Sequence, residues 1–168
     1  DFTNGPYLDT NTTATTISTS AHTVGTGRTM TASASTFAAT DVGRQVRFRD
    51  GYGVITAFTS ATVVTIQILV DMGSTSSSAD WSLGAWSATT GYPRTVSFFE
   101  QRLVFGGSES YPQTIWASQS GLYENFDAGD GSAADGFIYT IAANKVNVIR
   151  WLAPARDLIV GTVGGEFK

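Results

Sequence analysis

The chain of 168 residues contains no cysteine and only one histidine, His22. The lack of cysteine excludes a disulfide framework, a thiolate nucleophile and a cysteine-based metal site. Charged residues make up only 14% of the chain, and the formal net charge is −4. A groove that binds nucleic acid needs a stripe of basic residues to neutralise phosphates, so this balance argues against tight nucleic-acid binding.

Long apolar runs are missing as well. The longest, Val63–Val70, is interrupted by Thr65 and Gln67 and is far too short to cross a bilayer. We therefore expect no membrane anchor. The chain opens on "DFTNGPY", without a Met or a signal peptide, and we expect it to belong to a longer protein.

The residues that are present favour strands. Hydrophobic residues account for 42% of the chain and aromatic residues for 12%, and there are 18 glycines. Thr and Ser take much of the place that charged residues usually occupy, and together with Gly they favour strands and turns over helices. The composition therefore predicts an all-β fold.

The first half of the chain divides into two segments. Residues 1–17 carry few large apolar side chains and are expected to form an extended N-terminal arm, whereas residues 18–88 are expected to form a small β-barrel module. Alternating apolar residues on either side of Asp50-Gly51 predict a hairpin with a type I′ turn at that dipeptide. The segment before the hairpin is expected to bury Phe37 and Val42.

The second half of the chain contains one phrase twice. "TVSFFEQRLVFGG" at residues 95–107 and "APARDLIVGTVGG" at residues 153–165 each combine a strand, a polar corner with an Arg, a second strand and a glycine pair. Leu103 and Leu158 hold equivalent places about 55 residues apart, and a β-propeller blade has about this length and about four short strands. Residues 89–168 are therefore predicted to form an antiparallel β region that resembles the first one to two blades of an incomplete propeller.

Residue patterns typical of enzymes are weak. His22 would have to serve any Ser-His-Asp arrangement, but the chain has no G-x-S-x-G nucleophile motif. Glu100 and Glu109 could be proposed as a glycosidase pair, yet Glu100 lies in the predicted corner of a hairpin, where charged groups are usually solvated. We therefore expect that the protein is not an enzyme.

One loop has oxygen ligands of the kind that calcium prefers. The segment "DAGDGSAADG" contains Asp127, Asp130 and Asp135 among glycines, and hard cations bind carboxylate oxygens in such loops. The spacing of an EF-hand and its final bidentate Glu are absent, however, and Asp and Gly are also common turn residues. These aspartates are weak metal candidates, and we expect no metal and no cofactor.

The aromatic residues leave a second function open. Trp and Tyr side chains that are exposed can stack on sugars, although packing at strand ends is their more common role. A carbohydrate- or receptor-binding module of a tail or secreted protein is therefore the alternative function. The residues concerned are Trp81, Trp86, Tyr92, Trp116, Tyr123 and Trp151.

Several stretches of the sequence, which follow one another along the chain, resemble tail proteins of short-tailed phages and prophages. These tail proteins are of the nozzle, tubular or stabilisation type. They are "NGPYLDTNTTATTI", "DVGRQVRF", "GVITAFTSATVV" and "IRWLAPARDLIVGTVGGEF". The most specific stretch is Gly91–Phe126, with "YPRTVSFFEQRLVFGG", "PQTIWAS" and "YENF". The resemblance covers nearly the whole chain, and it suggests an N-terminal fragment of such a protein.

This resemblance implies a β-propeller that carries a small inserted β-barrel near its start. It also implies a ring of subunits in the virion tail that conducts or retains DNA, contacts neighbouring tail proteins and is assembled in the cytoplasm of the bacterial host. DNA would pass without sequence-specific binding. A mildly acidic wall is compatible with sliding, because tight binding of DNA depends on contacts between its phosphates and Lys or Arg side chains.

Such a protein would act through subunit interfaces, which are enriched in aromatic residues and Arg. The interface candidates all lie in the second half of the chain. They are Tyr92, Arg94, Phe99, Arg102, Tyr111, Trp116 and Tyr123.

Overall fold

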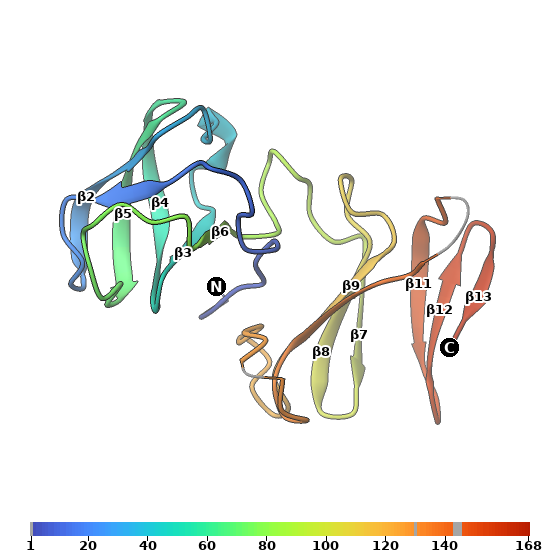
Figure 1. The fold of residues 1–168 in the computed structure, drawn as a ribbon. Helices are drawn as coiled ribbons and strands as arrows, with labels where there is room; N and C mark the ends of the chain where they lie inside the picture. The colour runs from blue at the N-terminus through green and yellow to red at the C-terminus, as the bar shows by residue number, and fades with distance from the viewer. Residues whose placement is uncertain (1, 130, 143–145) are drawn as a thin grey trace. The chain divides into compact units, whose positions relative to one another are not determined.

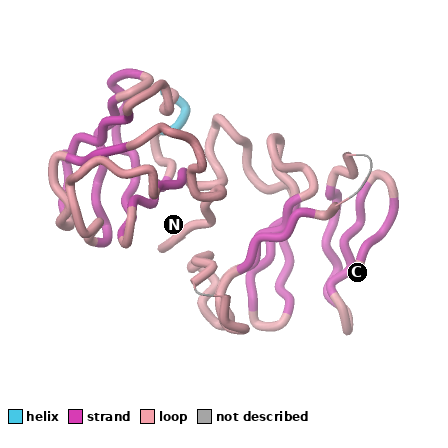
Figure 2. Tube along the Cα trace, in the orientation of Figure 1, coloured by secondary structure: helices cyan, strands magenta, loops and turns pink. Residues whose placement is uncertain are grey.

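The computed structural model describes residues 2–129, 131–142 and 146–168. The described residues form thirteen strands, all paired antiparallel, in three sheets. The ribbon and the tube coloured by secondary structure show these strands (Figures 1 and 2). The described residues include no α-helix, and their only helical turn is the three-residue 3-10 segment η1 (Ala39–Asp41). The all-β class predicted from composition is confirmed.

The chain divides into two compact units. The half-barrel unit comprises Tyr7–Thr89, and the two-sheet unit comprises Asp1–Pro6 together with Thr90–Lys168. The first is therefore inserted into the second near the start of the chain. The sequence patterns divide the chain differently, into an arm at residues 1–17, a barrel module at residues 18–88 and a β region at residues 89–168. That division stays a prediction.

The half-barrel unit contains one strongly curled sheet of six strands in the order β1-β2-β5-β4-β3-β6. The strands are β1 (Ile17–Thr19), β2 (Gly25–Ala32), β3 (Gln45–Phe48), β4 (Gly51–Ser60), β5 (Val63–Val70) and β6 (Trp81–Leu83). Three register shifts interrupt the pairing of β4 with β5, and such irregularities increase local twist and bending. The curl lets one sheet enclose its own core.

That core follows from the period-two pattern of the strands. On β5, Val64, Ile66 and Ile68 are completely buried and the residues between them are not, because alternate side chains of a strand point to opposite faces. The inward side chains of β3, β4 and the neighbouring segments meet them in one cluster. Its other members are Ile17, Met30, Ala32, Phe37, Val46, Phe48, Ile55, Met72 and Leu83.

Two local expectations in this unit are corrected. Phe48 pairs with Gly51, so the two loop residues of the hairpin are Arg49 and Asp50, with φ of 53° at Arg49. Gly51 is instead the first residue of β4, where an added Cβ would clash with the backbone of Asp71. Phe37 is buried as expected, but Val42 is 50% exposed, since it follows η1 in an extended conformation.

A segment of the N-terminal arm covers one edge of the half-barrel. Tyr7 forms an isolated antiparallel bridge with Gly84, and the backbone N–H groups of Leu8 and Asn11 donate to the carbonyls of Leu83 and Trp81 at 2.8 Å. We refer to residues 7–16 as the strap. The strap supplies partners for backbone groups of β6 that would otherwise form an open sheet edge.

The two-sheet unit begins with a four-stranded meander, in which each strand pairs with the next along the chain. Its strands are β7 (Thr95–Phe99), β8 (Arg102–Gly106), β9 (Thr114–Ala117) and β10 (Phe137–Thr140). A three-stranded meander follows, made of β11 (Ile149–Pro154), β12 (Leu158–Thr162) and β13 (Gly165–Phe167).

The repeated phrase forms the first hairpin of each meander. In the first copy the loop is Glu100-Gln101, whose φ angles of 46° and 59° are both positive, as in a type I′ turn that matches the twist of the strands. β11 lies beside β7 and also contacts β8 (Figure 1). The two meanders share one apolar cluster, which contains Val104, Ile115, Ala117, Ile141, Ile149 and Val160.

Candidate functional site

All seven interface candidates lie in the two-sheet unit, but they occupy different depths. The side chains of Tyr92, Arg94 and Tyr123 are exposed, and those of Phe99 and Tyr111 are half-buried. Arg102 is only 8% exposed and Trp116 only 1%. The surface accessible to another protein therefore involves the first three residues, whereas the other four pack mainly against their own chain.

Arg102 holds a loop of its own unit in place. Its guanidinium donates to the carbonyl oxygens of Ser118, Ala133 and Asp135 and lies over the ring of Phe137 at 5.7 Å. Hydrogen bonds from a charged donor are stronger than those between neutral groups. The arrangement ties residues 133–135 to the ends of β8 and β9.

The adjacent phenylalanines of β7 point to opposite faces. Phe99 packs against the shared core, whereas Phe98 is 60% exposed and meets the ring of Tyr123 edge-on at 5.2 Å. Val96 is exposed on the same face as Phe98 because it is two residues away on the strand. We refer to Val96, Phe98 and Tyr123 as the β7 face.

Sequence reasoning chose Phe99 and missed Phe98. Both faces of this hairpin carry apolar residues, so alternation alone does not tell which face is inward. The two-residue loop pairs Phe98 with Leu103 and Phe99 with Arg102, and only the buried position of Val104 on the same face as Phe99 decides the matter. Alternation already shows that the two rings point to opposite faces of the strand, but it does not show which of the two points inward.

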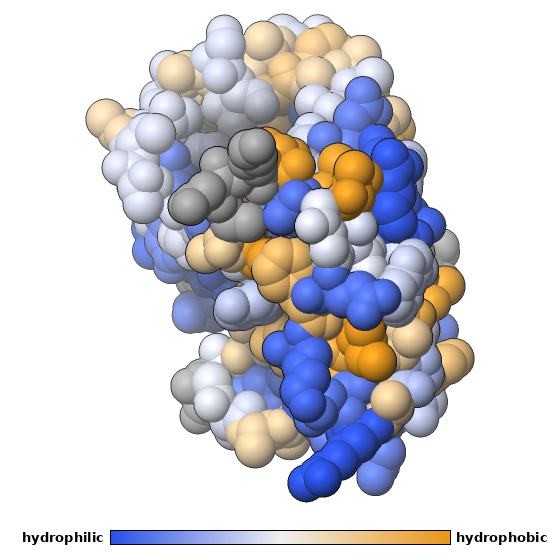
Figure 3. All heavy atoms as spheres, turned by 90° about the vertical axis from the view of Figure 1, so that its right-hand side faces the viewer, coloured by the Kyte–Doolittle hydropathy of each residue, from blue (hydrophilic) through white to orange (hydrophobic). Residues whose placement is uncertain are grey.

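A second partly exposed apolar surface lies on the three-stranded sheet. Leu152, Val160 and Phe167 face the shared core, so Trp151 and Ile159 lie on the opposite face of the sheet. Trp151 is exposed and lies over Gly161, where an added Cβ would meet the indole ring. Figure 3 looks onto the side of Figure 1 where these strands lie, and orange apolar residues are interspersed there among blue polar ones.

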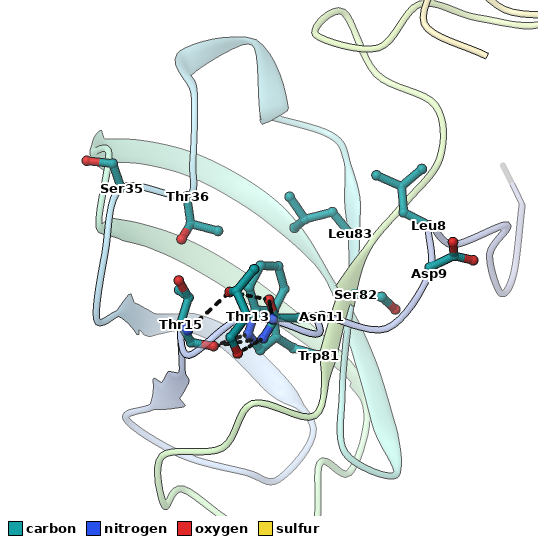
Figure 4. A pocket seen from close by; sticks show the side chains of 10 residues that line it. All are labelled: Leu8, Asp9, Asn11, Thr13, Thr15, Ser35, Thr36, Trp81, Ser82 and Leu83. Atoms are coloured by element: carbon teal, nitrogen blue, oxygen red, sulfur yellow. Dashed lines mark hydrogen bonds between the residues drawn. The ribbon is translucent and has the colours of Figure 1, made fainter. Parts of the chain in front are cut away.

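The half-barrel unit contains an open pocket of about 380 Å³ beneath the strap (Figure 4). Most polar groups of its lining already have partners. Asn11 donates to the carbonyls of Thr13 and Thr15, and the indole N–H of Trp81 donates to the Thr15 carbonyl at 3.0 Å. The remaining lining residues are Leu8, Asp9, Ser35, Thr36, Ser82 and Leu83.

Because these hydrogen bonds are internal, the pocket offers few groups to a sugar. Trp81 also packs against the core of the half-barrel, so its ring is not a free stacking surface of the kind that carbohydrate sites use. The carbohydrate-binding alternative stays a prediction, and this pocket does not favour it.

The acidic loop uses its carboxylates to fix turns. One oxygen of Asp127 accepts from the Gly129 N–H at 3.3 Å, and one oxygen of Asp135 accepts from the Ser132 N–H at 2.8 Å. Asp130 lies outside the described residues. Over residues 2–129, 131–142 and 146–168, no group of three or more His, Cys, Asp or Glu side chains could hold a metal ion.

His22 lies beside an aspartate, as a catalytic histidine would, but at an exposed position. Its Nδ1 is 2.9 Å from Oδ1 of Asp71, and both side chains are about half exposed. The same Asp71 oxygen accepts from the Gly73 N–H at 2.8 Å. The hydrogen bond to His22, and then that to Gly73, lowers the pKa of the Asp71 carboxyl. The pair joins the segment after β1 to the end of β5.

Comparison with known proteins gives no family for this chain. No protein-family model matches it, and no curated protein is significantly similar in sequence. In the part of the chain that the structure describes, no helix combines the length and the apolar character needed to cross a membrane.

Proposed function

We propose that this chain is part of a structural protein of a phage or prophage tail, of the nozzle or tubular type found in short-tailed viruses. In this proposal the half-barrel unit is a small β-barrel inserted at the start of a β-propeller, and the two-sheet unit supplies the first blades. The protein acts through contacts between subunits and with neighbouring tail proteins, in the virion tail. The proposal combines the sequence resemblance with the arrangement of the two meanders.

The observation that carries the proposal is the order of strands in the two-sheet unit. A four-stranded up-and-down meander is the unit of a propeller blade. Here β7–β10 form such a meander, and the repeated phrase then begins a second one at β11. The first strand of the second meander lies beside the first strand of the first, as expected for the inner strands of adjacent blades around a common axis.

The faces of the two sheets also support a stacked arrangement. One face of each sheet contributes to the shared core, where Val104 from β8 and Val160 from β12 belong to one cluster. The opposite faces retain exposed apolar groups, with Phe98 on the first sheet and Trp151 on the second. Sheets within a propeller are covered on both faces by their neighbours, so these residues are where further sheets or subunits would pack.

The charge of the chain fits a conduit that does not hold DNA. With 10 basic and 14 acidic residues, the chain offers little positive charge to phosphates, and it is phosphate contacts that produce tight, salt-dependent binding. We expect no measurable retention of duplex DNA at physiological ionic strength. Fluorescence anisotropy of a labelled duplex checks this expectation.

The decisive experiment locates the full-length protein in a virus particle. Antibodies raised against this chain should label the tail of purified particles in electron micrographs, and the isolated full-length protein should form rings. Particles with unlabelled tails, or a full-length protein that forms no ring, would contradict the proposal. Glycan-array binding that is lost on Trp81→Ala or Trp151→Ala would favour the carbohydrate-binding alternative instead.

A further inference from the structure

The outer edge of β10 carries backbone groups that can pair with another strand. The N–H of Ile141 donates to the carbonyl of Gln113 at 3.0 Å and continues the register in which Tyr139 pairs with Ile115. In an antiparallel pair, hydrogen-bonded and non-bonded positions alternate. Tyr139 therefore directs its backbone groups toward β9, and those of Ile138 and Thr140 point away from the sheet.

The free part of this edge is short and well defined. At its start, the N–H of Gly136 donates to the carbonyl of Asp127 at 2.9 Å, so the chain itself already occupies that position. Among the described residues of the two-sheet unit, none pairs with the outward groups of Ile138 and Thr140. These two residues lie two positions apart, which is the repeat of an antiparallel partner strand.

β10 is also held in place by contacts with its neighbours, and it carries no charged side chain. Phe137 lies against the Arg102 guanidinium, and the hydroxyls of Thr140 and Thr114 are 2.9 Å apart across the pair with β9. Residues 137–142 contain no charged side chain, and Tyr139 is 59% exposed. Natural sheets protect open edges with charges, proline, bulges or covering segments, and in the described part of the two-sheet unit none of these protects the edge at Ile138 and Thr140.

Three other sheet edges show such protection. Ser78 pairs with Ile17 beside β1, and the strap covers β6. β13 carries Glu166, and Lys168 just after it forms an ion pair with Asp157 at 2.8 Å. The edge of β10 therefore differs from these edges in being apolar, uncharged and open.

We propose that β10 pairs antiparallel with β10 of a second copy of this chain. A register that uses the outward groups of both copies places Ile138 opposite Thr140 of the partner, where the two residues exchange both N–H···O bonds. Tyr139 then faces Tyr139 of the partner at a non-bonded position, where side chains lie closest. The two four-stranded sheets join into one continuous sheet.

A second copy fits this edge better than an unrelated strand for two reasons. The outward groups of one copy match those of the other in number and spacing, and the uncharged strand brings no like charges together. Pairing also consumes the open edge of both chains, so the assembly is isologous and stops at the dimer. This inference goes beyond the tail function proposed above and does not depend on it.

Sedimentation equilibrium of the 168-residue chain tests the pairing. The contact is small, so we expect a dissociation constant on the order of 100 μM, with the mass approaching about twice 17.8 kDa at higher concentration. Tyr139→Lys and Tyr139→Glu should each weaken dimerisation roughly tenfold or more, because like charges then face each other. An equimolar mixture of the two variants should restore dimers through opposite charges.

Matched controls separate this edge from other exposed apolar positions. Val96→Lys alters the opposite edge strand of the same sheet and should leave dimerisation unchanged. Because the chain has no cysteine, Tyr139→Cys introduces a single thiol that should form a disulfide-linked dimer faster than Val163→Cys does. A monomer at all concentrations up to about 1 mM, dimers insensitive to the charge at position 139, or no rescue in the mixture would overturn the proposal.

Discussion

The two units of the chain solve the problem of covering an apolar sheet in different ways. The half-barrel unit curls one sheet around a core and covers the edge of β6 with the strap. The two-sheet unit packs one face of each meander against the other and leaves exposed apolar residues on both remaining faces. The first unit buries the apolar face of its sheet within itself, whereas the second leaves apolar side chains exposed.

The largest expected effect on stability comes from a comparison of two phenylalanines, one in each unit. Phe48 is completely buried in the half-barrel core, and Phe98 is mostly exposed on the β7 face. Phe48→Ala should lower the free energy of unfolding of its unit by about 3–5 kcal/mol, because it leaves a cavity. Phe98→Ala should change stability by less than about 0.5 kcal/mol.

Urea denaturation, followed by hydrogen-exchange mass spectrometry to separate the two units, measures both changes. Equal losses from the two substitutions would remove the distinction between a filled core and an exposed face. In the full-length protein we expect the opposite ranking, with Phe98→Ala the more damaging to assembly if the β7 face packs against another sheet or subunit.

The second prediction concerns the buried arginine of the two-sheet unit. Arg102→Met should destabilise that unit by about 2–3 kcal/mol, because the carbonyls of Ser118, Ala133 and Asp135 lose a charged donor. Amide exchange in residues 131–135 should accelerate first. Arg94→Met, at an exposed position, is the control and should have little effect; similar losses from both variants would show that burial of Arg102 is unimportant.

A third prediction probes the outer face of the three-stranded sheet. Gly161→Ala places a methyl group where the Trp151 indole lies, so the indole must move into solvent. We expect a red shift of tryptophan fluorescence and a loss of about 1–2 kcal/mol. The variant Trp151→Leu should make Gly161→Ala nearly neutral. An unchanged spectrum in Gly161→Ala would mean that the indole does not cover the strand.

The smallest effect is expected at the exposed pair in the half-barrel unit. Because the folded-state pKa of Asp71 is lowered, its contribution to stability is present above the unfolded pKa and is lost as pH falls through the folded pKa. His22→Ala should move the Asp71 pKa upward, though not fully, because the Gly73 N–H still donates to it. Carboxyl NMR titration measures the shift, and an unchanged pKa would exclude the His22 contact as its main cause.

Much of the strand pattern could be predicted from the sequence where alternation and turn residues agree. The first copy of the repeated phrase, residues 95–107, contains two strands as predicted, β7 and β8. In the second copy, residues 153–165, the first strand begins before the phrase, at Ile149, and ends at Pro154. Proline is tolerated at the end of a strand. The existence of a hairpin was predictable from its turn residues, but the exact loop was not, because the loop predicted at Asp50-Gly51 is formed by Arg49 and Asp50.

Burial of single side chains was harder to predict because it depends on partners distant in sequence. Arg102 lies next to a polar hairpin corner in the sequence, and it becomes buried only because residues 133–135 fold back over it. The roles of the seven interface candidates, the tail function and the ring stay predictions. Composition and periodicity specify the sheets, but they do not specify which sheet faces another protein will cover.

The insertion of Tyr7–Thr89 between two parts of the other unit has a consequence for synthesis on the ribosome. Phe2 is translated before the inserted segment, whereas its partners Phe105 and Phe126 are translated only after it. The half-barrel can complete its own core in that interval, while Phe2 still lacks its aromatic neighbours. On the ribosome, all residues of the half-barrel core are therefore available before the two-sheet unit has been completely translated.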